Sequence, residues 1–244
     1  MMITAAIVVI GNEILSGRTI DKNISHIANR LKQQGIQLSH VRIIADIEQE
    51  IIDNVLELSQ KYDHVMTTGG IGPTHDDITS ESLAKAFNEP YEIHAQAYDI
   101  LDQYYQSRDA EFNEGRVRMA KMPRNVTLIE NPLTAAPGFT IRNVHVLPGV
   151  PKIMQQMLEI LLKRLGHGPI KHEETIESPF PESEIALFLS EMQAKYSDID
   201  IGSYPHFSEN MIGFKNQIVI RAFDKNQLKQ CFDDINAYII KHRQ

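Results

Sequence analysis

The stretch 67–79 combines residue types that proteins use to bind phosphate groups and divalent cations. Its glycines allow main-chain N–H groups to approach an anion closely, and the helix predicted to follow adds a favourable dipole. Two adjacent carboxylates, Asp76 and Asp77, would repel a bare phosphate but could bind it through a bridging cation. The residues of this stretch that we expect to contact phosphate are Gly69, Gly70, Gly72, Pro73, Thr74 and Thr79.

A structural turn is the alternative interpretation of the same stretch. A turn between a buried strand and a helix needs one glycine and one capping Asp or Thr. This stretch has three glycines and a doubled aspartate, and the surplus favours a functional loop. His75, inside the stretch, fits a phosphate contact as well as it fits a solvent-facing position or a hydrogen bond to the backbone.

A second loop with two glycines, residues 11–17, contains a further carboxylate, Glu13. It follows the continuously apolar segment 3–10, which predicts a central strand covered on both faces. Further strands are predicted at 41–44 and 65–68, and helical periodicity separates each strand from the next. The alternation predicts right-handed crossovers and a parallel sheet with helices on both faces.

Ligands bind such sheets beyond the carboxyl ends of the strands, near the point where the strand order reverses. The loops 11–17 and 69–79 both follow strands, so both are predicted at this edge. Asp46, with Gln49 three residues later, predicts a capping box for the helix after the second strand. A strand at 144–147 runs into Pro148-Gly149-Val150-Pro151, a turn that would add N–H groups to the same edge.

The segments 95–105 and 112–122 carry aromatic and Met residues at helical spacing, which predicts two helices used in core or subunit packing. A domain boundary is indicated at Gly166-His167-Gly168-Pro169. We therefore expect a first α/β domain over residues 1–168 and a small α+β domain over residues 169–244.

Composition excludes several classes of function. The net charge is −8 without a compensating basic stretch, which argues against a nucleic-acid partner. The single cysteine, Cys231, excludes an intramolecular disulfide and a thiolate metal cluster, and its apolar neighbours predict burial. No apolar stretch is long enough to cross a membrane, so a cytoplasmic protein is expected.

Five separated motifs over residues 1–165 together resemble the N-terminal domain of the CinA competence/damage-inducible proteins, a domain of the MoaB/Mog molybdopterin-binding superfamily. These motifs are Gly11–Gly17, Asp21 with Asn23, Gly69–Thr79, Ala136–Phe139 and Leu147–Pro151. His75 and the run Gly202-Ser203-Tyr204-Pro205 are instead similar to the molybdopterin-binding-like domain of eukaryotic FAD synthases.

The resemblance implies a three-layer α/β sandwich with a mainly parallel sheet. It also implies metal-dependent hydrolysis of a dinucleotide pyrophosphate, ADP-ribose or FAD, to AMP and a second phosphate. Asp76 and Asp77 are the implied metal ligands, for Mg²⁺, Mn²⁺ or Co²⁺ with K⁺ as a further candidate, and Glu13 joins them as a catalytic residue. Beyond the loop 69–79, the implied binding residues are Gly11, Asn12, Asp21, Asn23, Pro148, Gly149, Ser203 and Tyr204.

Departures from the CinA pattern leave the substrate open. Asn12 stands where CinA proteins commonly have Thr, and Lys22 interrupts the usual Asp-Thr-Asn. The same loop would serve a protein that binds or adenylylates molybdopterin, or a nucleotide-binding module without turnover. We expect a homo-oligomer, and neither the nicotinamide-nucleotide deamidase activity of CinA proteins nor the adenylyltransferase activity of FAD synthases.

Overall fold

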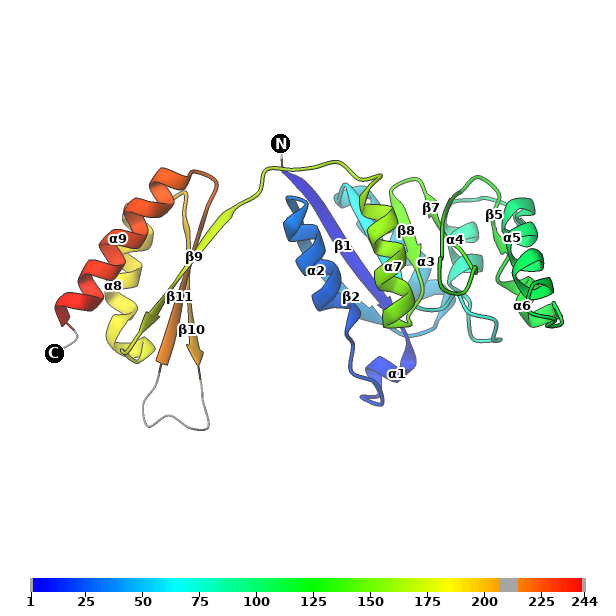
Figure 1. The fold of residues 1–244 in the computed structure, drawn as a ribbon, viewed down its shortest axis with the longest axis horizontal. Helices are drawn as coiled ribbons and strands as arrows, with labels where there is room; N and C mark the ends of the chain where they lie inside the picture. The colour runs from blue at the N-terminus through cyan, green and yellow to red at the C-terminus, as the bar shows by residue number, and fades with distance from the viewer. Residues whose placement is uncertain (1, 207–214, 243–244) are drawn as a thin grey trace. The chain divides into compact units, whose positions relative to one another are not determined.

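The computed structural model describes residues 2–206 and 215–242 of the chain (Figure 1). The chain divides into two compact units, Met1–Gly168 and Pro169–Gln244. Each unit has its own sheet and its own hydrophobic core, so each is described separately.

The first unit is built on a six-stranded sheet in the order β2-β1-β3-β8-β7-β6. Its first four strands run parallel to one another, and β7 and β6 are antiparallel to their neighbours. The strands are β1 (Ile3–Ile10), β2 (Ile36–Ile44), β3 (His64–Thr68), β6 (Thr127–Ile129), β7 (Gly138–Ile141) and β8 (Val144–Leu147).

Helices cover both faces of this sheet because the central strands are apolar on both sides. Residues 5–11 are all buried, and alternate side chains of β1 belong to different core clusters. The helices α2 (Asn23–Gln33) and α7 (Pro151–Leu162) pack on one face. The other face is covered by α3 (Glu48–Lys61), α4 (Thr79–Ala86) and α5 (Ala95–Gln106). The predicted α/β sandwich with a mainly parallel sheet is thus confirmed.

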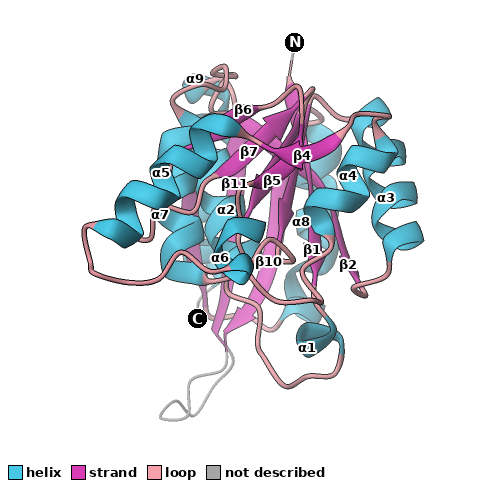
Figure 2. Cartoon of the chain, turned by 90° about the vertical axis from the view of Figure 1, so that its right-hand side faces the viewer, coloured by secondary structure: helices cyan, strands magenta, loops and turns pink. Residues whose placement is uncertain are grey.

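The winding direction reverses between β1 and β3. The helix α2, between β1 and β2, lies on one face, and α3, between β2 and β3, lies on the other, while β1 and β3 are neighbours in the sheet. Figure 2 shows α3 and α4 side by side along the strands. In doubly wound sheets this reversal opens a crevice at the carboxyl ends of the two central strands.

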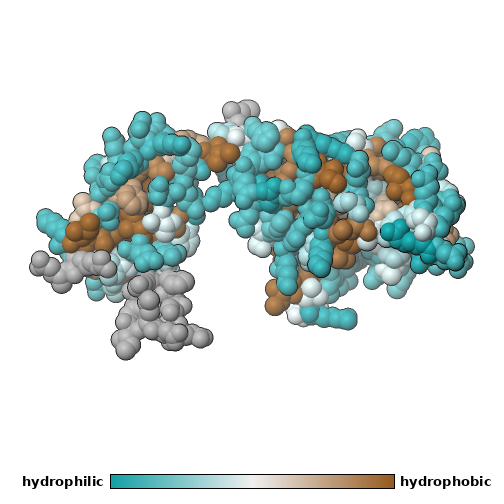
Figure 3. All heavy atoms as spheres, viewed as in Figure 1, coloured by the Kyte–Doolittle hydropathy of each residue, from teal (hydrophilic) through white to brown (hydrophobic). Residues whose placement is uncertain are grey.

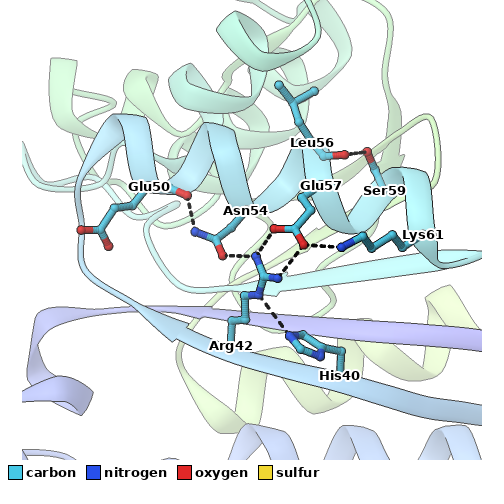
Figure 4. Close-up of polar contacts among 8 residues, drawn as sticks. All are labelled: His40, Arg42, Glu50, Asn54, Leu56, Glu57, Ser59 and Lys61. Atoms are coloured by element: carbon cyan, nitrogen blue, oxygen red, sulfur yellow. Dashed lines mark hydrogen bonds and ion pairs between the residues drawn. The ribbon is translucent and has the colours of Figure 1, made fainter.

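The edge strand β2 is fastened to α3 by a polar network (Figure 4). The Arg42 guanidinium makes two hydrogen bonds to the Glu57 carboxylate, at 2.7 and 2.9 Å, and a third to Asn54 Oδ1 at 2.7 Å. Lys61 Nζ also contacts Glu57, and the two cations lower the pKa of this carboxyl group to about 2. These contacts fix α3 against a strand that has no neighbour on its outer side in the described sheet.

The segment 112–122 is not the single helix that its apolar spacing predicts. It forms the short helix α6 (Glu114–Arg118) and then the strand β5 (Lys121–Pro123), which pairs with β4 (Tyr91–Ile93). The Asn113 side chain accepts a hydrogen bond from the Arg116 N–H and caps α6 at its start. Pro123 cannot continue a helix interior, and the Ala120 carbonyl already accepts a hydrogen bond from the His94 N–H. The second half of this segment is therefore a strand, because its pairing with β4 outweighs its helical spacing.

The second unit is a three-stranded antiparallel sheet in the order β10-β11-β9, packed against two helices. Its elements are β9 (His172–Ser178), α8 (Glu182–Lys195), β10 (Asp200–His206), β11 (Lys215–Ala222) and α9 (Lys225–His242). This β-α-β-β-α order is the predicted α+β layer, and Cys231 is buried in its core as expected.

The face of the chain in Figure 3 is mostly hydrophilic, with apolar residues in small patches. Within the part of the chain that the structure describes, none of the helices is both long and apolar enough to cross a bilayer.

Candidate functional site at the carboxyl edge of the parallel sheet

A cavity of about 440 Å³ opens at the carboxyl ends of the parallel strands. Loops that follow β1, β2, β3, β6 and β8 all contribute to its wall. The predicted site residues that line this cavity are Glu13, Gly69, Gly70, Gly72, Pro73, Asp76, Asp77, Pro148 and Gly149. The loops 11–17 and 69–79, which were selected by composition, thus meet in space, and the turn after β8 joins them.

The loop after β3 depends on glycine at two positions. Gly69 has φ +111°, and a Cβ there would lie 2.1 Å from the Ile10 carbonyl oxygen. Gly70 has φ +67°, and a Cβ there would lie 2.2 Å from the Thr79 hydroxyl. Thr79, fully buried, closes the turn, because its hydroxyl donates to the Gly69 carbonyl and its N–H to the Gly70 carbonyl, both at 3.0 Å. Thr79 therefore supports the loop from behind, outside the cavity lining.

The adjacent aspartates have different surroundings. Asp77 Oδ2 accepts hydrogen bonds from the Thr74 N–H at 2.9 Å and from the Thr74 hydroxyl at 2.5 Å, so this carboxylate holds the loop in shape. Asp76 is exposed, and the nearby Thr74 hydroxyl holds the pKa of Asp76 below its usual range. Asp76 is therefore ionised at neutral pH and is the aspartate better placed to contact a cation or water.

Asp46 is a fourth carboxylate in the cavity wall, and its role differs from the sequence-based prediction. The expected capping box is wrong: α3 has no side-chain cap at its start, and Gln49 donates instead to Asp53. Asp46 Oδ2 accepts the Asn12 N–H at 2.8 Å, which joins the loops after β1 and β2. Its position two residues beyond a parallel strand was the signal that could have placed Asp46 in the site.

Asn23 and Thr68 tie the site to the layer of helices behind it. Asn23 Nδ2 donates to Thr68 Oγ1 at 2.8 Å and to the Gly149 carbonyl at 2.9 Å, and Thr68 donates to the Pro148 carbonyl at 3.0 Å. Asp21 accepts the Ile24 N–H at the start of α2. The Asn23 side chain, at the start of α2, thus fixes the end of β3 and the turn after β8 with respect to each other.

Six of the predicted binding residues in the first unit do not line the cavity. They are Gly11, Asn12, Asp21, Asn23, Thr74 and Thr79. Ser203 and Tyr204 belong to β10 in the second unit, where the Ser203 hydroxyl accepts a hydrogen bond from Asn216 at 2.7 Å and lies 3.1 Å from a Glu182 carboxylate oxygen. Direct ligand contact by these residues stays a prediction.

The loop after β6 adds polar lining that sequence reasoning did not select. Asn131 and Thr134 line the cavity with Ala136. Asn131 Nδ2 donates to the Thr134 hydroxyl at 2.6 Å and to the Ala136 carbonyl at 2.9 Å, and Asn131 Oδ1 accepts two main-chain N–H groups of the same loop. The only sequence signal was the small-residue run 133–139 that includes the Ala136–Phe139 motif.

The cavity wall contains four carboxylates and no Lys, Arg or His side chain. Across residues 2–206 and 215–242, no three His, Cys, Asp or Glu side chains are arranged to enclose a metal ion. This donor set fits Mg²⁺ or a similar ion, which proteins bind through one or two carboxylates while substrate phosphates and water complete the coordination. Asp76 would hold such an ion, with Glu13 and Asp46 on the same wall.

Comparison with known proteins places these features in a family. Residues 6–167 match the family model described as "Probable molybdopterin binding domain", and residues 171–243 match the model of the FAD synthase middle domain. A protein of Archaeoglobus fulgidus is 33% identical over 224 residues, covering 92% of this chain and 93% of its own length. A protein of Pyrococcus furiosus is 30% identical over 253 residues and covers 98% of both chains.

Among solved structures, the protein CinA of unknown function from Thermoplasma acidophilum is 34% identical to this chain, with a TM-score of 0.61. The match covers 66% of this chain and 98% of that protein. Together these matches confirm the resemblance that the five motifs indicate for the first unit and the FAD-synthase similarity indicated for the C-terminal residues.

Proposed function

Because this chain belongs to the family of probable molybdopterin binding domains, with a C-terminal segment of the FAD synthase middle-domain type, we propose that its cavity binds and hydrolyses a dinucleotide pyrophosphate. The observation that carries the proposal is the meeting of three loop glycines with four carboxylates on the wall of one cavity. ADP-ribose and FAD are the proposed substrates, and AMP and a second phosphate monoester are the products. The match to the FAD synthase middle domain supports FAD as one of them.

In the proposed reaction the main-chain N–H groups of residues 70–72 bind phosphate oxygens, as glycine-rich loops before a helix do. The Gly69 N–H does not take part, because it donates to the Leu147 carbonyl at 3.1 Å. A divalent cation supplies charge neutralisation for the phosphates and activation of water when it is bound. Asp76 would bind the cation, and Glu13 would orient the attacking water. Asp77 acts indirectly, since its carboxylate is engaged with Thr74 and keeps the loop in shape.

The charge of the wall explains why a cation is part of the proposal. Four carboxylates repel a pyrophosphate, and this cavity offers no basic side chain to offset them. A bound divalent ion reverses the sign of the local potential. We therefore expect substrate binding to need Mg²⁺, Mn²⁺ or Co²⁺ and to be lost in EDTA.

The test is product analysis by mass spectrometry after incubation with ADP-ribose, FAD, NAD or ATP and each metal. We expect cleavage of ADP-ribose or FAD, and a turnover at least ~100-fold lower in Asp76→Asn. Asp99→Asn, on the exposed face of α5 and outside the cavity, is the matched control and should keep full turnover. Intact substrates under every metal condition would refute hydrolysis.

A second candidate function is binding of molybdopterin, and the family model over residues 6–167 is the observation that favours it. The loop 69–72 would then bind the pterin phosphate. Purified protein that carries pterin fluorescence, together with absence of pyrophosphate cleavage, would select this function over the first.

A further inference from the structure

A second cavity, of about 700 Å³, lies against the same loop and has a different character. Pro73 lines both cavities. The second cavity is lined by Arg118 and Lys121, by His75, by the ring of Phe112 and by a single carboxylate, Glu114. We call it the cationic cavity and the first one the acidic cavity.

The two cations of the cationic cavity are not held in ion pairs within the described part of the chain, although Arg118 attracts the nearby Asp76 carboxylate. Among the described residues neither Arg118 nor Lys121 forms an ion pair, whereas other cations such as Arg42 and Arg124 do. The Arg118 guanidinium donates to the Asp77 carbonyl at 3.3 Å, and its Nε is buried without an acceptor. A buried donor without an acceptor costs free energy, which an anionic ligand could recover.

An aromatic side wall accompanies these cations. The Phe112 ring lies 5.1 Å from the Tyr98 ring and 5.6 Å from the Tyr105 ring, to which it is stacked. The Arg116 guanidinium carbon lies over the Tyr105 ring, 4.2 Å from the ring centroid. Phe112 is thus held by its neighbours and presents part of its surface to the cavity. A fixed aromatic ring beside cations suits a ligand that joins a planar base to a phosphate.

We propose that the cationic cavity binds a nucleoside monophosphate without a metal ion, with the phosphate on Arg118, Lys121 and His75 and the base against Phe112. This inference extends the proposed function, because hydrolysis of a dinucleotide pyrophosphate produces such a ligand. The binding itself does not require turnover. The contrast in charge gives the two cavities opposite metal requirements: the acidic cavity needs a cation to accept phosphate, and the cationic cavity does not.

Calorimetric titration of AMP into the full chain in EDTA tests the proposal. We expect binding in wild-type protein, and at least about tenfold weaker binding in Lys121→Gln and in Arg118→Gln, since each removes a charge-assisted hydrogen bond. Arg124→Gln is the matched control: this arginine is exposed, is paired with Glu92 at 2.8 Å and lies outside the cavity, so AMP binding should be unchanged. Higher salt should weaken AMP binding to wild-type protein.

Inorganic phosphate and Phe112→Ala separate the two parts of the ligand. Phe112→Ala should weaken AMP binding about tenfold and leave binding of inorganic phosphate unchanged, because stacking involves only the base. Equal loss for both ligands would remove the base from the proposal. Lys121→Gln with unchanged AMP affinity, or AMP binding that appears only with Mg²⁺, would overturn it.

The acidic-cavity variant keeps this test apart from the test of hydrolysis. Asp76→Asn should bind AMP in EDTA at least as tightly as wild-type protein, because Asp76 does not line the cationic cavity and its negative charge attracts Arg118. A protein that binds AMP in EDTA but cleaves no dinucleotide would keep this inference and refute hydrolysis. A protein that cleaves ADP-ribose but binds no AMP in EDTA would support hydrolysis and refute this inference.

Discussion

The two ends of β3 and β8 are both polar, yet their side chains are used in opposite ways. At the amino end, His64 Nδ1 lies 3.1 Å from His145 Nε2, and His145 Nδ1 lies 3.0 Å from the Thr140 hydroxyl. His145 is only 4% exposed, and all its polar atoms have partners. At the carboxyl edge of the sheet, Asp76 in the loop after β3 and Glu13 after the neighbouring β1 are exposed on the wall of the acidic cavity.

This difference separates structural from functional polarity. Burial lowers the pKa of both histidines, and that of His145 falls to about 3, so the pair is neutral at physiological pH and serves packing. At the other end, the pKa of Asp76 is also lowered, but there the nearby Thr74 hydroxyl favours the charged form of the group. The buried, uncharged contacts of His64, His145 and Thr140 rigidify the sheet, and the exposed charges at the opposite edge are available to a ligand.

Gly69→Ala should give the largest effect on stability. The new Cβ would meet the Ile10 carbonyl at 2.1 Å in a backbone conformation that L side chains rarely adopt, so we expect a loss of ~3 kcal/mol or more. Chemical denaturation would measure it. Gly149→Ala is the control, since its Cβ would find its nearest neighbour at 3.4 Å, and a loss below ~1 kcal/mol is expected. A loss in Gly69→Ala as small as that in Gly149→Ala would show that the loop after β3 tolerates a side chain at residue 69.

Acid should reveal the histidine pair as a stability element. Because the pKa of His145 is about 3 in the folded chain and near 6.5 when unfolded, the unfolded chain binds more protons below pH 6.5. The contribution of His145 to stability is therefore complete only well above pH 6.5 and falls as the pH decreases toward 3, by ~1.6 kcal/mol between pH 6.5 and 5. Denaturation at several pH values should show this slope in wild-type protein and a shallower slope in His145→Gln. The same slope in both proteins would contradict the assignment.

Asn143→Ala should have the smallest of these effects. Asn143 Nδ2 donates to the Ser59 and Tyr62 carbonyls, both at 2.9 Å, and so anchors the end of α3 beside the start of β8. Loss of these hydrogen bonds should cost ~1–2 kcal/mol in thermal unfolding and leave ligand affinity unchanged. Asn125→Ala, which removes an exposed contact to Glu89, should change stability by less than ~0.5 kcal/mol. Reduced ligand affinity in Asn143→Ala would contradict the assignment of a purely structural role to the polar residues at the amino end of the sheet.

The fold was largely predictable because periodicity and turn chemistry agree along most of the chain. Residues 3–10 are apolar throughout and form the buried strand β1, and the strand predicted at 144–147 has the observed bounds. Prediction failed where tertiary pairing decides the structure. The apolar spacing of 112–122 fits a helix, but hydrogen bonds across β4 and β5 select a strand for its second half.

The candidate site was predictable in part. The loops 11–17 and 69–79 are recognisable because glycines and adjacent carboxylates exceed what turns require. Asp46 was predicted to cap a helix because Gln49 follows three residues later, whereas its hydrogen bond to Asn12 spans 34 residues and is not visible in the local sequence. Arg118 and Lys121 were missed for the same reason: only the folded chain brings α6 and β5 to the loop at Pro73.

The contact between Arg118 and the Asp77 carbonyl has a thermodynamic consequence. One side chain reaches both the loop of the acidic cavity and the wall of the cationic cavity, and Pro73 belongs to both walls. If substrate bound in the acidic cavity changes the protein's affinity for AMP by some factor, bound AMP must change the protein's affinity for substrate by the same factor. Substrate and AMP affinities measured separately and together therefore give a single coupling energy, and Arg118→Gln should bring it toward zero.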